Sequence, residues 1–124
     1  MSKPTNDQRH FTRVALDLPV DVHQGGSMWP QRLIDLSLAG VGTDQPDIWD
    51  AQYNEPFTLI IYTSGERGDS TNQVELHAYL QHVEAARLGF TVQHIDRENI
   101  EPLRELLETR MDATLLEEEL GQLD

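Results

Sequence analysis

The sequence predicts a mainly β protein, a small antiparallel barrel or sandwich followed by one or two C-terminal helices. Six short segments between residues 14 and 95 carry the apolar residues of strands, and most of them alternate between apolar and polar positions. The final thirty residues change to helical spacing, and no βαβ rhythm precedes them. Because the strands are apolar on alternate positions, we expect one face in the core and the other in water.

The first three strands lie near the start of the chain. Residues 14–22 are apolar at every even position, and Pro19 among them indicates an edge strand or a bulge. The glycine pair at 25–26 is typical of a turn. A second strand should run through about 31–36, followed by a turn and a short third strand from Val41.

Three further strands are predicted after the loop-like residues 44–56. They cover residues 57–63, 73–83 and 88–95, with a loop rich in Gly and Ser before the second of them. Period-two spacing places these residues on their inner faces: Phe57, Leu59 and Ile61; Val74, Leu76, Ala78 and Leu80; Leu88, Phe90 and Val92.

Residues 97–124 are expected to form the helical segment. Either Asp96 or Asn99 could cap the first helix, and Pro102 favours Asn99 because proline is tolerated in the first helical turn. Asp112 could cap a second, short helix. The leucines of this segment either dock on the β domain or present a surface to a partner protein, and the sequence leaves both open.

Length and composition indicate a single globular domain. The chain has 124 residues, of which 38% are hydrophobic, and no apolar run approaches the 18 residues of a membrane-spanning helix. It has no cysteine, so disulfides and thiolate metal sites are excluded. The polar N-terminus lacks the core of a signal peptide, so we expect a cytoplasmic protein without membrane insertion.

The net charge of −13 argues against DNA or RNA as a partner. The charge is uneven along the chain, because residues 1–40 hold four basic and four acidic residues. Residues 41–100 hold three basic and ten acidic, and residues 101–124 hold two and eight. If the protein binds an anion, the neutral N-terminal third is therefore where it should bind; chance, or an acidic surface kept for solubility, is the alternative.

Two motifs in that third carry groups suited to a nucleotide. Arg9 and Arg13 form an Arg-x-x-x-Arg motif, and the guanidinium fork makes bidentate bonds to phosphate or to the O6/N7 edge of guanine. In "DLSLAG", Asp35 can accept hydrogen bonds from guanine, and Ser37 can bind a phosphate oxygen or hold the turn. Gly40 permits a close approach to the backbone.

The two motifs, their spacing and the small β-rich domain resemble the PilZ family. The segment "RLGFTVQHID" at 87–96 is similar to that family's last strand before its helix, and the resemblance covers residues 8–111. It implies a six-stranded antiparallel split β-barrel that binds the bacterial messenger cyclic di-GMP. The expected organisation is an N-terminal flexible arm at 1–13, a barrel at 14–96 and a helical segment at 97–124.

The resemblance also assigns roles to the residues. It implies that Arg9 and Arg13 hold phosphates and guanine, while Asp35, Ser37 and Gly40 hold the other side of a guanine.

Two departures from the family pattern concern the edge of the site. Gln8 stands where some members have a further arginine, which bears on how many ligand molecules bind. Many members place a flat side chain near 79–83, for which His82 is the candidate and Tyr79 the fallback. Simple alternation puts His82 on the inner face, so a packed histidine is an equal alternative.

No pattern of an enzyme or metal protein competes with this interpretation. The five histidines show no metal-ligand spacing, Ser37 lies in no nucleophile motif, and "SGERGDS" lacks the lysine of a P-loop. We therefore expect no catalysis, no metal and no cofactor. Two functions remain: a cyclic di-GMP receptor that switches and then binds a downstream protein, or a PilZ-like scaffold that binds protein independently of nucleotide.

Overall fold

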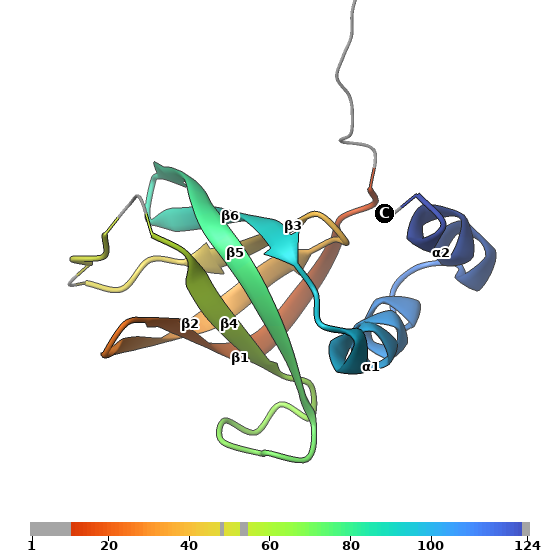
Figure 1. Ribbon diagram of the computed structural model, residues 1–124, viewed down its shortest axis with the longest axis horizontal. Helices are drawn as coiled ribbons and strands as arrows, with labels where there is room; N and C mark the ends of the chain where they lie inside the picture. The colour runs from red at the N-terminus through yellow and green to blue at the C-terminus, as the bar shows by residue number, and fades with distance from the viewer. Residues whose placement is uncertain (1–10, 48, 53–54, 123–124) are drawn as a thin grey trace, which may run out of the picture.

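The computed structural model describes residues 11–47, 49–52 and 55–122, and it contains six strands followed by two helices (Figure 1). The elements are β1 Val14–Gln24, β2 Ser27–Leu36, β3 Gly40–Asp44, β4 Phe57–Tyr62, β5 Gln73–Glu84, β6 Arg87–His94, α1 Arg97–Glu108 and α2 Ala113–Leu120. Figure 1 shows both helices on one side of the strands, with α1 the nearer to β5. Among the described residues, no helix has the length and apolar character needed to cross a membrane.

The strands close into a barrel in the order β1-β2-β3-β6-β5-β4, and all neighbouring strands are antiparallel. This confirms the predicted mainly β class. Of the two predicted architectures, barrel and sandwich, the protein forms the barrel. Period-two alternation points one apolar row of each strand inward. The interior is filled by residues with no exposed surface, among them Val20, Val22, Val41, Leu59, Ile61, Val74, Leu76 and Leu88.

Two irregularities in the register redirect side chains that simple alternation assigns to the core. One lies between Ala15 and Leu18 of β1, next to Pro19, and leaves Leu18 half-buried. β1 pairs with β2 throughout and with β4 only from Val20 onward, so Pro19 lies next to the bulge and just outside the stretch that is paired on both sides. The other lies between Leu80 and His82 of β5 and leaves His82 exposed. The alternative of a packed, inward-facing His82 is therefore wrong.

Helix α1 begins earlier than expected, with Asp96 and not Asn99 at its N-cap. The prediction of Asn99 is wrong because that side chain has a tertiary partner: its Oδ1 accepts a hydrogen bond of 2.8 Å from the backbone N–H of Glu75 on β5. Pro102 consequently lies inside the helix, where it cannot donate a backbone hydrogen bond. The packing of three leucines against the barrel offsets that loss: Leu103, Leu106 and Leu107.

Helix α2 is capped as predicted, since the Asp112 carboxylate accepts a hydrogen bond of 3.1 Å from the N–H of Leu115. Leu116 is completely buried in the core cluster, whereas Leu115 keeps 38% of its surface exposed. The sequence left open whether these leucines dock on the β domain or face a partner protein. Leu116 is confirmed as a docked, core residue. Leu123, the last leucine of the segment, lies outside the described residues.

The same helix also holds the start of the described chain. The Glu119 side chain, only 4% exposed, accepts hydrogen bonds from the N–H of Thr12 at 3.1 Å and from its hydroxyl at 2.6 Å. Figure 1 shows this first described segment running beside the end of α2. Thr12 stands between the two motif arginines in the sequence, so α2 fixes the backbone directly before Arg13.

Candidate functional site

A cavity of about 370 Å³ opens on the outside of the barrel, where the chain enters β1. That volume lies within the roughly 300–1,000 Å³ of small-molecule sites. The lining comes from the segment before β1, the β2–β3 turn, the end of β5 and the start of β6: Phe11, Arg13, Ser37, Ala39, Gly40, Gln81, His82, Arg87, Gly89, Phe90 and Thr91. Three residues of the two sequence motifs thus meet at one cavity.

The sheet register brings these distant parts of the sequence together. Gly40 of β3 pairs with Thr91 of β6, and Gly42 pairs with Gly89. Gly89 in turn pairs with His82 of β5. Residues at alternate positions of a strand share a face, so these pairs lie on the outer face of the barrel.

Glycines leave space for polar side chains to lie flat on this part of the sheet. A Cβ atom added to Gly89 would lie 2.5 Å from Nε2 of His82, so the imidazole rests directly on the Gly89 backbone. A Cβ atom on Gly42 would collide with the Asp35 carboxylate and come within 2.9 Å of Nη2 of Arg87. Any larger residue at either position would displace the side chains that surround the cavity.

Asp35 stands between two arginines beside the cavity. Its Oδ1 accepts a hydrogen bond of 2.8 Å from Nη2 of Arg13, and its Oδ2 pairs with Nη2 of Arg87. Partial burial raises the pKa of the Asp35 carboxyl, but the hydrogen bonds and positive charges of Arg13 and Arg87 outweigh it and lower the pKa below its ordinary value. Asp35 is therefore a carboxylate at neutral pH, and it orients both guanidinium groups.

Ser37 shapes the turn that forms one edge of the cavity. Its Oγ accepts hydrogen bonds from the N–H groups of Ala39 and Gly40, at 3.1 and 3.0 Å, and its own N–H donates to the Gly40 carbonyl at 2.9 Å. Of the two roles considered for this hydroxyl, the structure shows the one that holds the turn. Gly40 lets Arg13 approach closely, since a Cβ atom there would lie 2.7 Å from Nη1 of Arg13.

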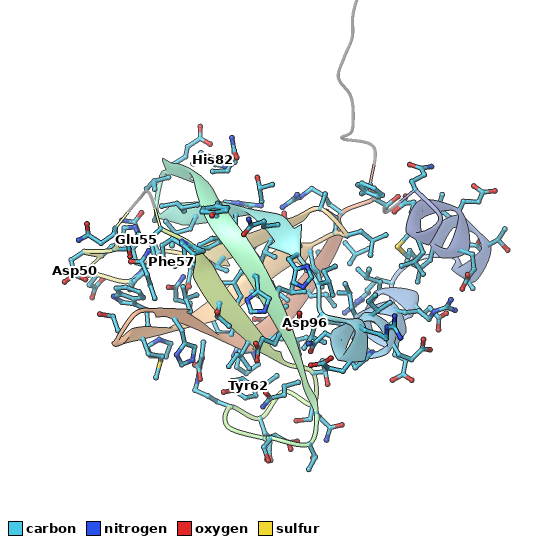
Figure 2. The ribbon with its side chains drawn as sticks, in the orientation of Figure 1. Asp50, Glu55, Phe57, Tyr62, His82 and Asp96 are labelled. Atoms are coloured by element: carbon cyan, nitrogen blue, oxygen red, sulfur yellow. The ribbon has the colours of Figure 1, made fainter. Side chains whose placement is uncertain are left out.

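Of the two flat side chains considered, the structure places His82 at the cavity and Tyr79 away from its lining. Tyr79 is 38% exposed and pairs with Thr91 on the same outer face. Figure 2 shows His82 near the end of β5 that is remote from α1. The bulge after Leu80 produces this position, and a bulge leaves no mark in the pattern of apolar residues.

Sequence reasoning did not identify Arg87, which contributes a second guanidinium to the site. It begins the segment "RLGF" at 87–90, and a lone arginine at the start of a strand is usually only solvated charge. The one feature of the sequence that could have pointed to this part of the site is Gly89, because a glycine inside a strand often marks the close approach of another group. Gln81 and Thr91, hydrogen-bonded to each other at 2.9 Å, were also not identified.

Two candidate ligand residues, Gln8 and Arg9, lie outside the described residues. Their proposed contacts, and the flexible arm expected at 1–13, stay predictions. Within that arm, the structure describes only Phe11, Thr12 and Arg13.

The closed barrel, with an arginine-bordered cavity on its outer face, defines a small β domain. The model of the PilZ domain family matches residues 7–109, and the chain belongs to this family. That match includes both sequence motifs and extends through α1.

Solved structures with 18% sequence identity have the same fold. The inhibitor of motility from Bacillus subtilis (MotI/DgrA) matches 86% of this chain with a TM-score of 0.60, and the match covers 55% of that longer chain. The PilZ domain of CeSA from a cellulose-synthesizing bacterium matches 79% of this chain, also with a TM-score of 0.60, and 97% of its own length.

Proposed function

We propose that this protein binds cyclic di-GMP in the cavity next to β1 and acts as a ligand-switched adaptor for a downstream protein. The observation that carries the proposal is the meeting of Arg13, Ser37 and Gly40 at one cavity, with Asp35 directly beside it. Membership of a family whose domains typically bind cyclic di-GMP adds support. The role is one of binding and regulation, without catalysis.

The charges around the cavity suit a guanine dinucleotide. Arg13 and Arg87 offer guanidinium forks, which match phosphate oxygens and the O6/N7 edge of guanine. The Asp35 carboxylate can accept hydrogen bonds from guanine N1–H and the amino group. Adenine presents an amino donor where guanine has O6, so cyclic di-AMP would leave these partners mismatched.

The ion pairs already present around Asp35 do not prevent binding. The Arg13 and Arg87 side chains keep 46% and 43% of their surface exposed, so a ligand can reach both guanidinium groups, whereas the Asp35 side chain keeps only 18%. A hydrogen bond to a charged group contributes about 1.5–3 kcal/mol. Phosphate contacts can therefore replace one or both pairs if the guanine donors take over the Asp35 carboxylate, which would otherwise lose its partners.

His82 supplies a flat surface at the mouth of the cavity. Its imidazole lies against the Gly89 backbone, and the ring is exposed. A base that enters the cavity can stack on such a ring, which contributes about 1–3 kcal/mol for an aromatic side chain.

The switch would operate through the segment that leads to β1. Arg13 lines the cavity, and the adjacent Thr12 is bound to Glu119 of α2. A ligand held by Arg9 and Arg13 would reposition this segment, provided that it binds the repositioned state more tightly. The surface formed by the segment and α2 would then differ between the free and bound protein, and a partner could recognise that difference.

Calorimetric titration tests the ligand. Cyclic di-GMP should bind, while GMP and cyclic di-AMP should bind much more weakly, and Arg13→Ala should weaken binding by about ten- to a hundredfold. Arg110→Ala, which removes an arginine outside the cavity lining, is the matched control and should bind as the parent does. Absence of both heat and a thermal shift with cyclic di-GMP would instead support the nucleotide-independent scaffold.

Hydrogen exchange tests the switch separately from the ligand. Addition of cyclic di-GMP should protect backbone amides in residues 5–14 and 35–42. Protection confined to 35–42 would mean that the ligand occupies a rigid site, and the switching mechanism would have to be abandoned.

A further inference from the structure

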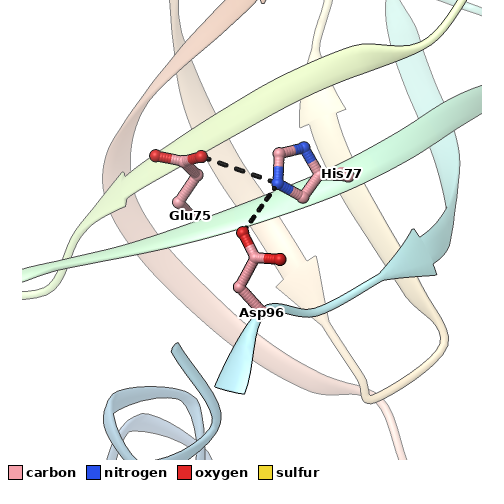
Figure 3. A group of neighbouring side chains, drawn as sticks. All are labelled: Glu75, His77 and Asp96. Atoms are coloured by element: carbon pink, nitrogen blue, oxygen red, sulfur yellow. Dashed lines mark hydrogen bonds and ion pairs between the residues drawn. The ribbon is translucent and has the colours of Figure 1, made fainter. Parts of the chain in front are cut away.

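A second cluster of polar side chains lies at the other end of the β5–β6 hairpin, next to α1. Glu75 and His77 are two residues apart on β5 and so share the outer face. His77 pairs across the sheet with His94 of β6, and Asp96 follows two residues later at the junction with α1. Figure 3 shows Glu75, His77 and Asp96 converging, and Figure 2 shows Asp96 well separated from His82.

The spacing of the donor atoms suits a metal ion. Nε2 of His77 lies 3.2 Å from Oδ2 of Asp96 and 3.6 Å from Oε2 of Glu75, and all three atoms lie within 4.8 Å of one another. Tetrahedral zinc with bonds of about 2.0–2.1 Å requires ligand atoms about 3.3 Å apart. Two of the three separations are close to that value, and a small side-chain rotation would close the third.

The charges of the cluster also favour a cation. Among the residues that the structure describes, no Arg or Lys pairs with Glu75 or Asp96, and their ionic partners are only the imidazoles of His77 and His94. Two carboxylates gathered at one imidazole make this part of the surface acidic, and a divalent ion would be attracted to it. The three side chains keep between 30% and 39% of their surface exposed, so an ion can reach them.

We propose that Glu75, His77 and Asp96 bind a divalent transition-metal ion of the zinc type. Imidazole and carboxylate are ligands that zinc accepts, and water would complete the coordination. The ion would bind Nε2 of His77 in place of the present contact with Asp96, and the ring would then carry its hydrogen on Nδ1. His94 would act as a supporting partner, since its Nε2 lies 2.7 Å from the other oxygen of Asp96.

Such a site would join β5 to the start of α1. Asp96 is the N-cap residue of α1 but makes no capping hydrogen bond with its side chain, and its carboxylate instead contacts His77 and His94. The Asn99 side chain already bonds the Glu75 backbone in the same place. A bound ion would add a second connection between barrel and helix, and it should raise the melting temperature by binding only the folded state.

The test is a titration of tag-free protein with Zn²⁺, followed by calorimetry and by thermal unfolding. His77→Gln and Asp96→Asn should each raise the dissociation constant by at least about tenfold, because the loss of even a supporting partner has an effect of that size. His23→Gln removes a histidine of β1 outside the cluster and should leave both the affinity and the thermal shift unchanged.

X-ray absorption at the zinc edge supplies a readout that tests the ligands directly. The parent protein should show nitrogen and oxygen ligands with the outer-shell scattering of an imidazole, and His77→Gln should lose that scattering. The proposal is overturned if the parent binds no Zn²⁺, or if His77→Gln and Asp96→Asn bind it as tightly as the parent does.

Discussion

The contact between Glu119 and Thr12 leads to a sharp prediction for stability. Glu119 accepts hydrogen bonds from two Thr12 groups, the backbone N–H and the hydroxyl, and its side chain is buried at 4% exposure. Glu119→Ala would remove both hydrogen bonds and leave two donors of Thr12 without a protein partner. The variant should therefore be less stable than the parent.

The expected loss follows from the number and surroundings of these bonds. A hydrogen bond to a charged group contributes about 1.5–3 kcal/mol, and Thr12 supplies two donors. Because Thr12 is only half-buried, water can reach the donors that Glu119 leaves, which favours the lower end of the range. The Glu119 carboxylate is also buried at a cost in solvation energy, and Glu119→Ala removes that cost. The expected loss of stability is therefore smaller still. We expect the free energy of unfolding to fall by about 2 kcal/mol, equivalent to roughly 10 °C in melting temperature.

Urea unfolding followed by circular dichroism measures this loss. Glu118→Ala is the matched control, since it removes the same charge and side chain from an exposed position on the same helix. It should change the free energy of unfolding by less than about 0.5 kcal/mol. A double-mutant cycle with Thr12→Ala should give a coupling energy of about 1–2 kcal/mol. Equal losses for Glu119→Ala and Glu118→Ala would refute the reasoning.

Three further predictions concern the cavity and the C-terminal segment. Arg87→Ala should weaken cyclic di-GMP binding by about tenfold in calorimetry with little loss of stability, because its side chain is 43% exposed; unchanged affinity would remove Arg87 from the site. Removal of residues 112–124 should lower the melting temperature and increase the binding of a hydrophobic dye, because it uncovers the core around Leu116; an unchanged melting temperature would show that α2 is dispensable for folding. The low pKa of Asp35 means that the folded state binds its proton less tightly than the unfolded chain does. This contribution to stability is complete above about pH 5 and is lost as the pH falls through and below the ordinary value of 3.8. Asp35→Asn should therefore show a smaller fall in unfolding free energy between about pH 5 and 3, and a parallel fall in both proteins would argue against the ion pairs.

The strands could be predicted because burial on one face imposes a period of two on the sequence. Predicted residues such as Val20, Leu59 and Leu76 are all completely buried. The prediction failed where a register shift interrupts that period, at Leu18 and at His82. A bulge adds one residue between paired strands, and its position depends on the partner strand as much as on the local sequence.

The helix start illustrates a different limit. Pro102 favours Asn99 as the cap by a local rule, but the Asn99 side chain bonds the backbone of Glu75 on β5 and the helix begins at Arg97. A proline inside a helix costs about 3 kcal/mol, and the burial of Leu103, Leu106 and Leu107, at about 1.5–3 kcal/mol each, exceeds that cost. Sequence reasoning had no access to this contact between β5 and α1.

Of the residues at the candidate site, only those that belong to the two short sequence motifs could be predicted. Arg13 and Asp35 are 22 residues apart, and their ion pair agrees with the expectation that both motifs serve one site. Arg87 lies 52 residues from Asp35 and reaches it because β6 closes the barrel against β3. Its participation follows from strand order, which alternation of apolar residues does not specify.

The relative strength of two contacts indicates which part of the molecule would move in a switch. Leu116 fixes α2 in the core, and removal of a buried leucine side chain destabilises a protein by about 2–5 kcal/mol. The bonds between Thr12 and Glu119 are expected to contribute about 2 kcal/mol. The hydrogen bonds that Arg13 can make to a phosphate contribute a similar energy and could replace them. A ligand that draws Arg13 toward the cavity would therefore detach Thr12 from Glu119, hold the segment before β1 against itself, and leave α2 in place. The surface available to a partner would then be the vacated face of α2 around Glu119, rather than a displaced helix.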